Sequence, residues 1–232
     1  MFLTRLFLDP SARTVRADLA DPDGLHKTVM RMFPSNLGER AREQLGVLHR
    51  LDDGQAGRPV VLVQSKQAPD AAALPRGYLV DLTKDAELAF SGVAENPSIR
   101  NVEGERAGIA TGHQFLFRLK ASTTRKILTK TGPDGRRSNG KRVPVNGDEA
   151  RLEWLRRHAA AGGFTFSDLR VNEVRARGHQ GPERVRVAGA IFDGTLCVGD
   201  LALFQRALTN GVGPAKAYGF GLLSIRQVPG AQ

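Results

Sequence analysis

One order of strand-like and helix-like segments occurs twice along this 232-residue chain, and this repetition restricts the fold more than any other feature. In the first half, residues 3–8 indicate a short strand, and Asp21-Pro22 has the form of a helix N-cap followed by proline at the first helical position. Apolar residues then recur at helical spacing until Pro34 ends the helix. The other segments expected in this half are strands at 46–51, 59–65 and 78–82 and a short helix at 70–74.

The second half repeats this order. A strand with one basic face is expected at 115–121, a helix around 152–159, strands at 169–177 and 184–192, a helix around 201–208 and a last strand at 219–225. Strand, helix, strand, strand, helix, strand is the ferredoxin-like, or RRM-like, arrangement. We therefore expect an α+β protein with two tandem ferredoxin-like domains. They would occupy residues 1–91 and 113–232, with a linker or insertion at 92–112.

Composition narrows the class of protein. With 41% hydrophobic residues the chain can build a buried core, so global disorder is not expected. The single cysteine, Cys197, allows no internal disulfide, which favours a reducing compartment. Arg5 and Asp9-Pro10 interrupt the N-terminal apolar run, and no segment approaches the roughly 18 uninterrupted apolar residues of a membrane span. A cytoplasmic protein without membrane contact is the expectation.

Positive charge is concentrated in one part of the chain. The formal net charge is +10, and residues 118–142 hold nine Lys or Arg against one acidic residue, so +8 of the +10 lies there. Residues 131–142 are almost without apolar side chains and should form a loop or a hairpin tip. A solvated surface loop is the plain alternative, but a block this concentrated favours a polyanionic partner. A membrane surface fits less well, because no amphipathic helix with aromatic anchors flanks the block.

A glycine-rich segment, residues 211–221, lies between the last predicted helix and the last predicted strand. Its four glycines and Lys216 would let backbone N–H groups and one cation approach a phosphate. The segment lacks the P-loop pattern, and Lys216 stands where a dinucleotide fingerprint has its third glycine. Binding of a nucleoside triphosphate is therefore disfavoured, and a turn that only permits tight packing is an equal alternative.

The C-terminal sequence resembles the CasE family, the CRISPR repeat-RNA endoribonucleases of type I-E Cascade complexes. The strongest likeness lies in residues 192–200, 204–208 and 211–224. It extends over nearly the whole chain, through the shorter runs Leu3-Thr4-Arg5-Leu6, Leu25-His26, Met32-Phe33-Pro34, Val61-Leu62-Val63-Gln64-Ser65, Phe117-Arg118-Leu119 and Gly140-Lys141-Arg142-Val143-Pro144. The glycine-rich segment alone indicates the wider repeat-processing superfamily, and the other runs narrow the resemblance to CasE.

The resemblance implies two tandem ferredoxin-like domains and metal-independent cleavage of precursor CRISPR RNA at the base of the repeat hairpin. The ribose 2′-hydroxyl would attack the adjacent phosphate, and the enzyme would stay bound to the mature guide RNA among other Cascade subunits. No cofactor is implied. No bound metal is expected either, because His49, His113, His158 and His179 have no partner at metal-ligand spacing.

The resemblance places the catalytic histidine at His26, on the first predicted helix. Histidine suits proton transfer near neutral pH, and a helix N-terminus favours a bound anion. Lys27 and Arg31, four residues apart, are expected to neutralise phosphate charge in the transition state. By spacing alone, however, His26 lies on an apolar helix face and would be a packing residue. Some family members carry a tyrosine three residues before this histidine, where this chain has Asp23, so an acid–base partner is not assigned.

The basic block is expected to hold the RNA stem. The major groove of A-form RNA is too deep and narrow for side chains to read, so shape and phosphate contacts should dominate. An aromatic content of 6% argues against base stacking as the main mode of binding. The predicted RNA-binding residues are Arg125, Lys126, Lys130, Arg136, Arg137, Lys141, Arg142, Gly211, Gly213 and Lys216. The alternative is a non-catalytic module that binds structured RNA, with His26 as a packing residue.

Overall fold

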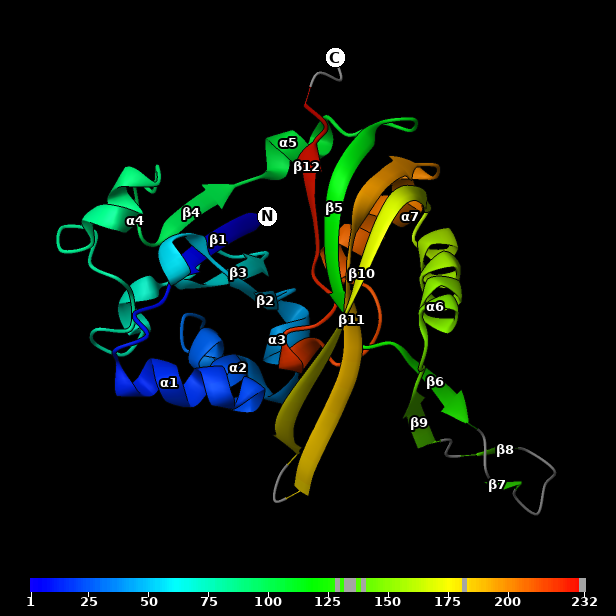
Figure 1. Ribbon diagram of the computed structural model, residues 1–232, viewed down its shortest axis with the longest axis horizontal. Coiled ribbons are helices and arrows are strands. Elements are labelled where there is room, and N and C mark those ends of the chain that lie inside the picture. Colours follow the sequence, from blue (N-terminus) through cyan, green and yellow to red (C-terminus); the bar gives the residue numbers. More distant parts are fainter. Residues whose placement is uncertain (128–129, 132–136, 139–140, 181–182, 230–232) are drawn as a thin grey trace.

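In the computed structural model, the described residues are all except 128–129, 132–136, 139–140, 181–182 and 230–232. They form two four-stranded antiparallel sheets with the orders β2-β3-β1-β4 and β10-β11-β5-β12 (Figure 1). In both sheets the first strand of the repeat lies between the third and the fourth, which is the ferredoxin-like topology. The predicted fold class, α+β with two ferredoxin-like domains, is confirmed. No helix in the described part of the chain is long and apolar enough to cross a membrane.

The first sheet takes its strands from the N-terminal part of the chain. Its strands are β1 Phe2–Phe7, β2 Leu48–Asp53, β3 Pro59–Ser65 and β4 Ser98–Asn101. The helices around it are α1 Arg13–Ala20, α2 Pro22–Met30, α3 Ala41–Gln44, α4 Ala86–Phe90 and α5 Glu103–Ala107, with 3₁₀ turns at Ser35–Arg40, Gln55–Gly57 and Ala71–Ala73. Leu25 and Val29 of α2 are buried in one core with Val61 and Val63 of β3, so the apolar stripe of this helix packs on the sheet.

One predicted strand of the first domain is wrong. Residues 78–82 form no strand, and only Leu79 makes an isolated bridge, to Leu8. The fourth place in the sheet is taken by β4, which pairs with β1 and lies inside the segment predicted as a linker. Three of its four residues are exposed, so β4 lacks the apolar alternation by which a strand is recognised in a sequence. The other predicted domain boundaries stay predictions.

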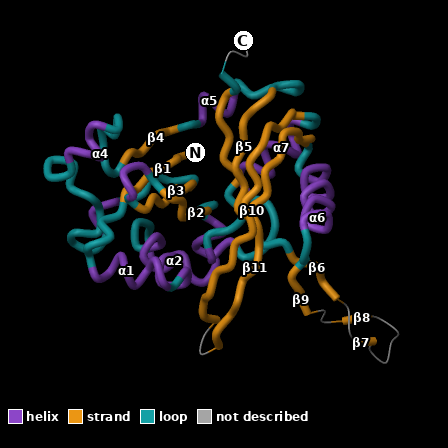
Figure 2. The backbone as a smooth tube through the Cα atoms, in the orientation of Figure 1, coloured by secondary structure: helices purple, strands orange, loops and turns teal. Residues whose placement is uncertain are grey.

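The second sheet has longer strands, and two of them extend beyond its hydrophobic core. Its strands are β5 Gln114–Ala121, β10 Phe164–Gln180, β11 Glu183–Val198 and β12 Leu223–Gln227, and its helices are α6 Asp148–Ala161 and α7 Leu201–Asn210. Trp154, Phe192 and Phe204 form the centre of its core. The pairing of β11 with β5 ends at Ala190, and beyond this residue β10 and β11 continue as a two-stranded ribbon (Figure 2).

Most of the basic block follows β5, and the described residues between 124 and 144 form an arm that projects from the second domain (Figure 1). Its strands are β6 Thr124–Ile127, β7 Lys130–Thr131, β8 Arg137–Ser138 and β9 Lys141–Pro144. β6 pairs with β9 and β7 with β8, both antiparallel, so the expected hairpin is confirmed for the described residues. In Figure 1 the arm and α2 lie on opposite sides of the ribbon.

Candidate active site

His26 lies on α2, where this helix meets the second domain. Asp21 caps the helix by accepting a hydrogen bond from the backbone N–H of Asp23, and Pro22 occupies the first turn, as the sequence predicts. The helix packs against the 3₁₀ turn η4, Lys216–Tyr218, within the glycine-rich segment. The structure therefore brings together the histidine and the lysine that the sequence singles out separately, although 190 positions separate them in the chain.

His49, on the edge strand β2, lies beside His26. The two imidazole rings are nearly parallel, with an interplanar angle of 17° and centroids 5.7 Å apart. The side chain of His49 is completely buried, and neither of its ring nitrogens has a hydrogen-bond partner. His26 is half-buried, and its Nδ1 is likewise buried without a partner. Because Nδ1 faces inward, Nε2 is the nitrogen of His26 that is left to exchange a proton with a substrate.

Both imidazoles are held in the neutral form. Burial is the main cause that lowers the pKa of His26, and the positive charges of Arg42 and Lys27 lower it further, while Asp23 acts in the opposite direction. Burial, followed by His26, Lys120 and Arg42, lowers the pKa of His49 to about 3. A neutral imidazole at physiological pH has a free nitrogen lone pair, so His26 is suited to accept a proton.

Arg42 and Lys216 join Lys27 and Lys120 among the cations near this histidine pair. Arg42 of α3 donates a hydrogen bond from Nη1 to the carbonyl oxygen of Val47, and its charge acts on His26, His49 and Lys216. Burial lowers the pKa of Lys216, and Arg42 lowers it further. Glu43 acts on Lys216 in the opposite direction, and a bound anion would likewise favour its charged form. Sequence reasoning missed Arg42, because α3 has only four residues and no periodic pattern.

The two cations predicted beside His26 have other environments. Lys27 forms an ion pair with Asp23, whose Oδ2 lies 2.7 Å from Nζ. Asp23, which stands where some family members carry a tyrosine, therefore offsets the charge of Lys27. Arg31 lies at the C-terminal end of α2, where its charge acts on Tyr78. Arg42 is thus better placed than Arg31 to act on a phosphate beside His26, because its charge already acts on this histidine.

Tight packing explains the glycines of the glycine-rich segment. A Cβ on Gly211 would lie 2.7 Å from the carbonyl oxygen of Gly221 and 2.9 Å from Cδ1 of Leu48. A Cβ on Gly213 would lie 2.9 Å from the ring of Trp154. Both glycines have φ above +70°, which other residues rarely adopt. Their predicted contact with RNA stays a prediction, whereas their packing role is visible in the structure.

The described basic side chains of the arm are exposed, and two of them oppose each other. Arg125, Lys126 and Arg142 are all exposed, and Lys126 lies directly across from Arg142 in the pairing of β6 with β9. Like charges opposite one another destabilise an antiparallel pair unless a counter-ion neutralises them. Of the other predicted residues, Lys130, Arg137 and Lys141 lie on the arm strands, and Arg136 lies outside the described residues.

The remaining described histidines lie elsewhere. His113 is exposed, and the ring of His158 is stacked on Trp154 with centroids 3.7 Å apart. Within the described ranges there is no group of three or more His, Cys, Asp or Glu side chains placed to hold a metal ion. The expectation that no metal is bound stays a prediction.

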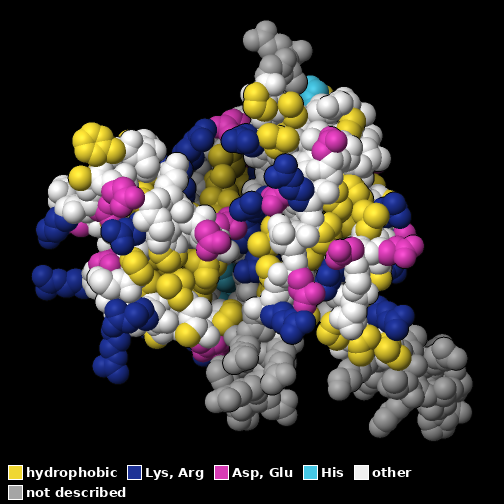
Figure 3. Space-filling view, viewed as in Figure 1, with side chains coloured by type: hydrophobic (Ala, Val, Ile, Leu, Met, Phe, Trp, Pro, Cys, Tyr) yellow, Lys and Arg dark blue, Asp and Glu magenta, His cyan; other side chains and the backbone are white. Residues whose placement is uncertain are grey.

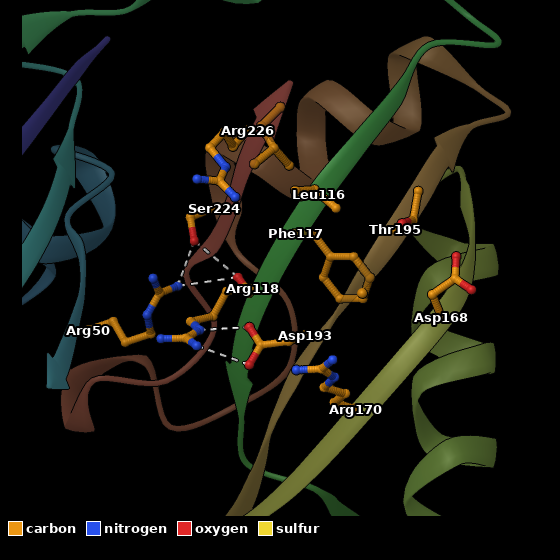
Figure 4. A pocket seen from close by; sticks show the side chains of 12 residues that line it. Arg50, Leu116, Phe117, Arg118, Asp168, Arg170, Asp193, Thr195, Ser224 and Arg226 are labelled. Carbon is orange, nitrogen blue, oxygen red and sulfur yellow. Dashed lines mark hydrogen bonds and ion pairs between the residues drawn. The ribbon is translucent and has the colours of Figure 1, made fainter. Parts of the chain in front are cut away.

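A buried arginine fastens the two domains together next to this site. Nη1 of Arg50, on β2, donates hydrogen bonds to the carbonyl oxygen of Arg118 at 3.2 Å and to Oγ of Ser224 at 2.8 Å (Figure 4). It also donates to the carbonyl oxygen of Leu222 at 3.3 Å. Its Nε binds both carboxylate oxygens of Asp52 at 2.8 to 2.9 Å. We call this group the Arg50 clamp.

The Arg50 clamp forms one wall of a cavity of about 710 Å³ over the open face of the second sheet. The cavity is lined by three further arginines and two aspartates, which are Arg118, Arg170, Arg226, Asp168 and Asp193. Basic and acidic side chains gather around the hollow at the middle of the face in Figure 3. Arg118 is bound to Asp193 at 2.7 Å, so part of this positive charge is already paired.

Comparisons with known proteins match this chain over nearly its whole length. The family model "CRISPR associated protein" matches residues 1–227. The chain is 30% identical to the CRISPR-associated endoribonuclease Cse3 of Thermus thermophilus, over 97% of this chain and 99% of that protein. It is 25% identical to the CRISPR system Cascade subunit CasE of Escherichia coli (strain K12), over 97% and 98%. The structure of Thermus thermophilus Cse3 bound to an RNA representing a pre-cleavage complex is similar, with a TM-score of 0.74, 26% identity and coverage of 97% and 98%.

Proposed function

Because this chain belongs to the Cse3/CasE family of CRISPR-associated proteins, we propose that it is an endoribonuclease that cuts precursor CRISPR RNA at the base of the repeat hairpin. We further propose that cleavage needs no metal ion and that the protein stays on the mature guide RNA with other Cascade subunits. The observation that carries the proposal is the position of His26 at the junction of the two ferredoxin-like domains. Its lowered pKa favours a neutral imidazole, and the cations Arg42 and Lys216 lie on the elements around it.

In the proposed reaction, Nε2 of His26 takes the proton from the ribose 2′-hydroxyl. The 2′-oxygen then forms a bond to the adjacent phosphorus, the bond from phosphorus to the 5′-oxygen breaks, and the leaving oxygen takes up a proton from water. The products are a 2′,3′-cyclic phosphate and a 5′-hydroxyl. The negative charge that grows on the phosphate in the transition state would be stabilised by Arg42 and Lys216.

The chemistry can be tested with two substrates and a chelator. A repeat hairpin with an all-ribose backbone should be cut in the presence of excess EDTA at the rate found without it. The same hairpin with one 2′-deoxynucleotide 5′ to the scissile phosphate should bind equally well and stay intact, because the attacking oxygen is absent. Single-turnover gels measure the rates. Cleavage of the deoxy substrate, or a requirement for added magnesium, would exclude the proposed reaction.

The arm should grip the RNA stem through phosphates rather than through bases. Replacing Arg125, Lys126 and Arg142 together by glutamine should weaken hairpin binding. It should also reduce the slope of log affinity against log salt concentration by roughly three units, one for each lost phosphate contact. Cleavage of saturated complex should slow far less, because α2 and the arm lie on opposite sides of the ribbon (Figure 1). Filter binding across a salt series measures the slope.

A matched control removes the same charge from the other domain. The triple variant Arg76→Gln, Lys84→Gln and Arg100→Gln changes three exposed cations of the N-terminal part of the chain. It should leave the salt slope close to that of the wild type. An equal loss of slope in both triple variants would mean that net charge, and not the arm, governs binding.

One observation favours a second function. His26 is half-buried beside His49 and its Nδ1 is sealed from solvent, as a packing residue would be. On that basis the chain would be a structured-RNA-binding module without turnover. Substitution of His26 separates the two functions, because a packing histidine would affect stability but not bond cleavage.

A further inference from the structure

The imidazole of His49 is a polar group that ordinary packing does not explain. The side chain is fully buried on β2 between Leu48 and Arg50, and both ring nitrogens lack a hydrogen-bond partner. A buried polar group that stays unpaired lowers the stability of the folded protein, because it loses its hydrogen bonds to water. A phenylalanine or leucine would fill a core position without this cost. A histidine at this place is explained if its ring nitrogens form a hydrogen bond in another state of the protein.

His26 supplies the complementary unpaired group. A neutral imidazole that uses Nε2 as a base must carry its proton on Nδ1, and Nδ1 of His26 is a buried atom with no acceptor. The two rings are nearly parallel, at 17°, with centroids 5.7 Å apart. Two imidazoles joined by an N–H···N bond of about 3.0 Å have centroids about 5.2 Å apart. The observed rings are stacked with centroids about 0.5 Å farther apart than this, so one ring must shift and turn its edge toward the other before the bond forms.

Resting on the proposed function, we propose that His49 is the positioning residue of the reaction: it accepts a hydrogen bond from Nδ1–H of His26 once RNA is bound. This bond fixes the tautomer that leaves Nε2 free to take the 2′-hydroxyl proton. It also stabilises the imidazolium that forms when the proton arrives. Catalytic hydrogen bonds that are long in the free enzyme commonly tighten in the substrate complex.

The surroundings of His49 suit an acceptor. Burial and the nearby cations lower its pKa to about 3, so the ring stays neutral and keeps one unprotonated nitrogen. The backbone at Gly219 closes over the ring, since a Cβ there would lie 3.6 Å from Nε2 of His49. Water is thus kept from the inner side of the pair, and within the described residues His26 is the ring that contacts His49.

Three variants test the inference. His49→Phe keeps an aromatic ring without a nitrogen and should fold, because it removes two unpaired polar atoms from the core. It should bind the repeat hairpin with wild-type affinity and cleave it roughly 10²-fold more slowly in single turnover, the scale of loss for a misplaced catalytic group. His49→Asn and His49→Gln restore an amide oxygen near Nδ1 or Nε2, and one of them should recover at least tenfold of that loss. The expected result is slow cleavage by the Phe variant and rescue by one amide.

Two results would overturn the inference. Wild-type cleavage by the Phe variant would make His49 a packing residue, and equally slow cleavage by all three variants would mean that acceptance of a hydrogen bond is not its role. A readout that needs no cleavage is the ¹⁵N spectrum of His26 with bound 2′-deoxy hairpin, assigned with the His26→Ala variant. The Nδ1–H tautomer should predominate in the wild type and lose its dominance in His49→Phe. A wild-type protein that binds but does not cut would instead refute the proposed function.

Discussion

Replacing His26 by alanine should abolish almost all cleavage of the repeat hairpin and leave its binding nearly unchanged. A general acid–base group contributes about 10²- to 10⁴-fold to a rate, and the single-turnover rate should fall by that factor. The affinity should stay within about threefold, because the described arm cations and Lys216 are untouched by the change. Quenched-flow or manual single-turnover assays give the rate, and filter binding of the 2′-deoxy hairpin gives the affinity.

His113 offers the matched control. It is exposed and lies outside the junction of the two domains, so His113→Ala removes an imidazole without touching the site. Its rate and affinity should equal those of the wild type. A His26→Ala protein that cuts as fast as His113→Ala would leave RNA binding as the function, with His26 as a packing residue. Loss of binding together with cutting would indicate that the substitution disturbs the interface between α2 and η4 instead of the chemistry.

Local signals in the sequence predict part of this site correctly. The cap at Asp21, the proline after it and the apolar spacing place the helix that carries His26, because all three act within a few residues. The β-α-β-β-α-β order likewise survives the loss of one predicted strand, since the order of the other segments still defines the topology. Residues 78–82 have strand-like composition but pair only at Leu79, and a strand exists only where it finds a partner.

The rest of the site depends on contacts that no local pattern encodes. Arg42 is on a helix of four residues, and His49 is an ordinary position of a predicted strand. Their relation to His26 arises only when β2 and α3 fold beside α2 and the second domain places η4 against them. Lys27 differs from Arg42 and His49, because its environment can be predicted from the sequence. Its neighbour Asp23 is visible in the sequence, and the i, i+4 spacing already predicts the ion pair that offsets its charge.

Replacing Arg50 by methionine should destabilise the protein by about 3–5 kcal/mol, the cost of breaking a buried ion pair by removing one partner. The side chain of Arg50 is 4% exposed and that of Asp52 is 14% exposed. Without Arg50, the aspartate would have only the longer contact with Arg118, at 3.8 Å, and little solvent around it. Two carbonyl oxygens and a hydroxyl of the second domain would also lose the hydrogen bond from Arg50. Urea unfolding followed by circular dichroism measures the loss.

Two further variants test whether the loss of stability comes from the buried ion pair. In the double variant Arg50→Met and Asp52→Asn no charge is left unpaired, so its loss of stability should be smaller than the sum of the two single losses. Arg100→Met breaks the ion pair with Glu105, in which both side chains are more than 60% exposed, and should cost less than about 1 kcal/mol. If Arg50→Met were to unfold at the wild-type urea concentration, the Arg50 clamp would contribute nothing to stability.

The Arg50 clamp should matter for cleavage as well as for stability. His26, His49 and Arg42 belong to the first domain and Lys216 to the second, so the site exists only while the two domains keep their register. A second link acts in the same direction, since Nε2 of Gln64 donates to the carbonyl oxygen of Leu208 at 2.8 Å, just before the glycine-rich segment. At a temperature where the Arg50→Met variant remains folded, its cleavage rate should therefore fall. The hairpin should stay bound, because the contacts made by the arm are unchanged. Wild-type cleavage by the folded variant would mean that packing between α2 and η4 alone aligns the site.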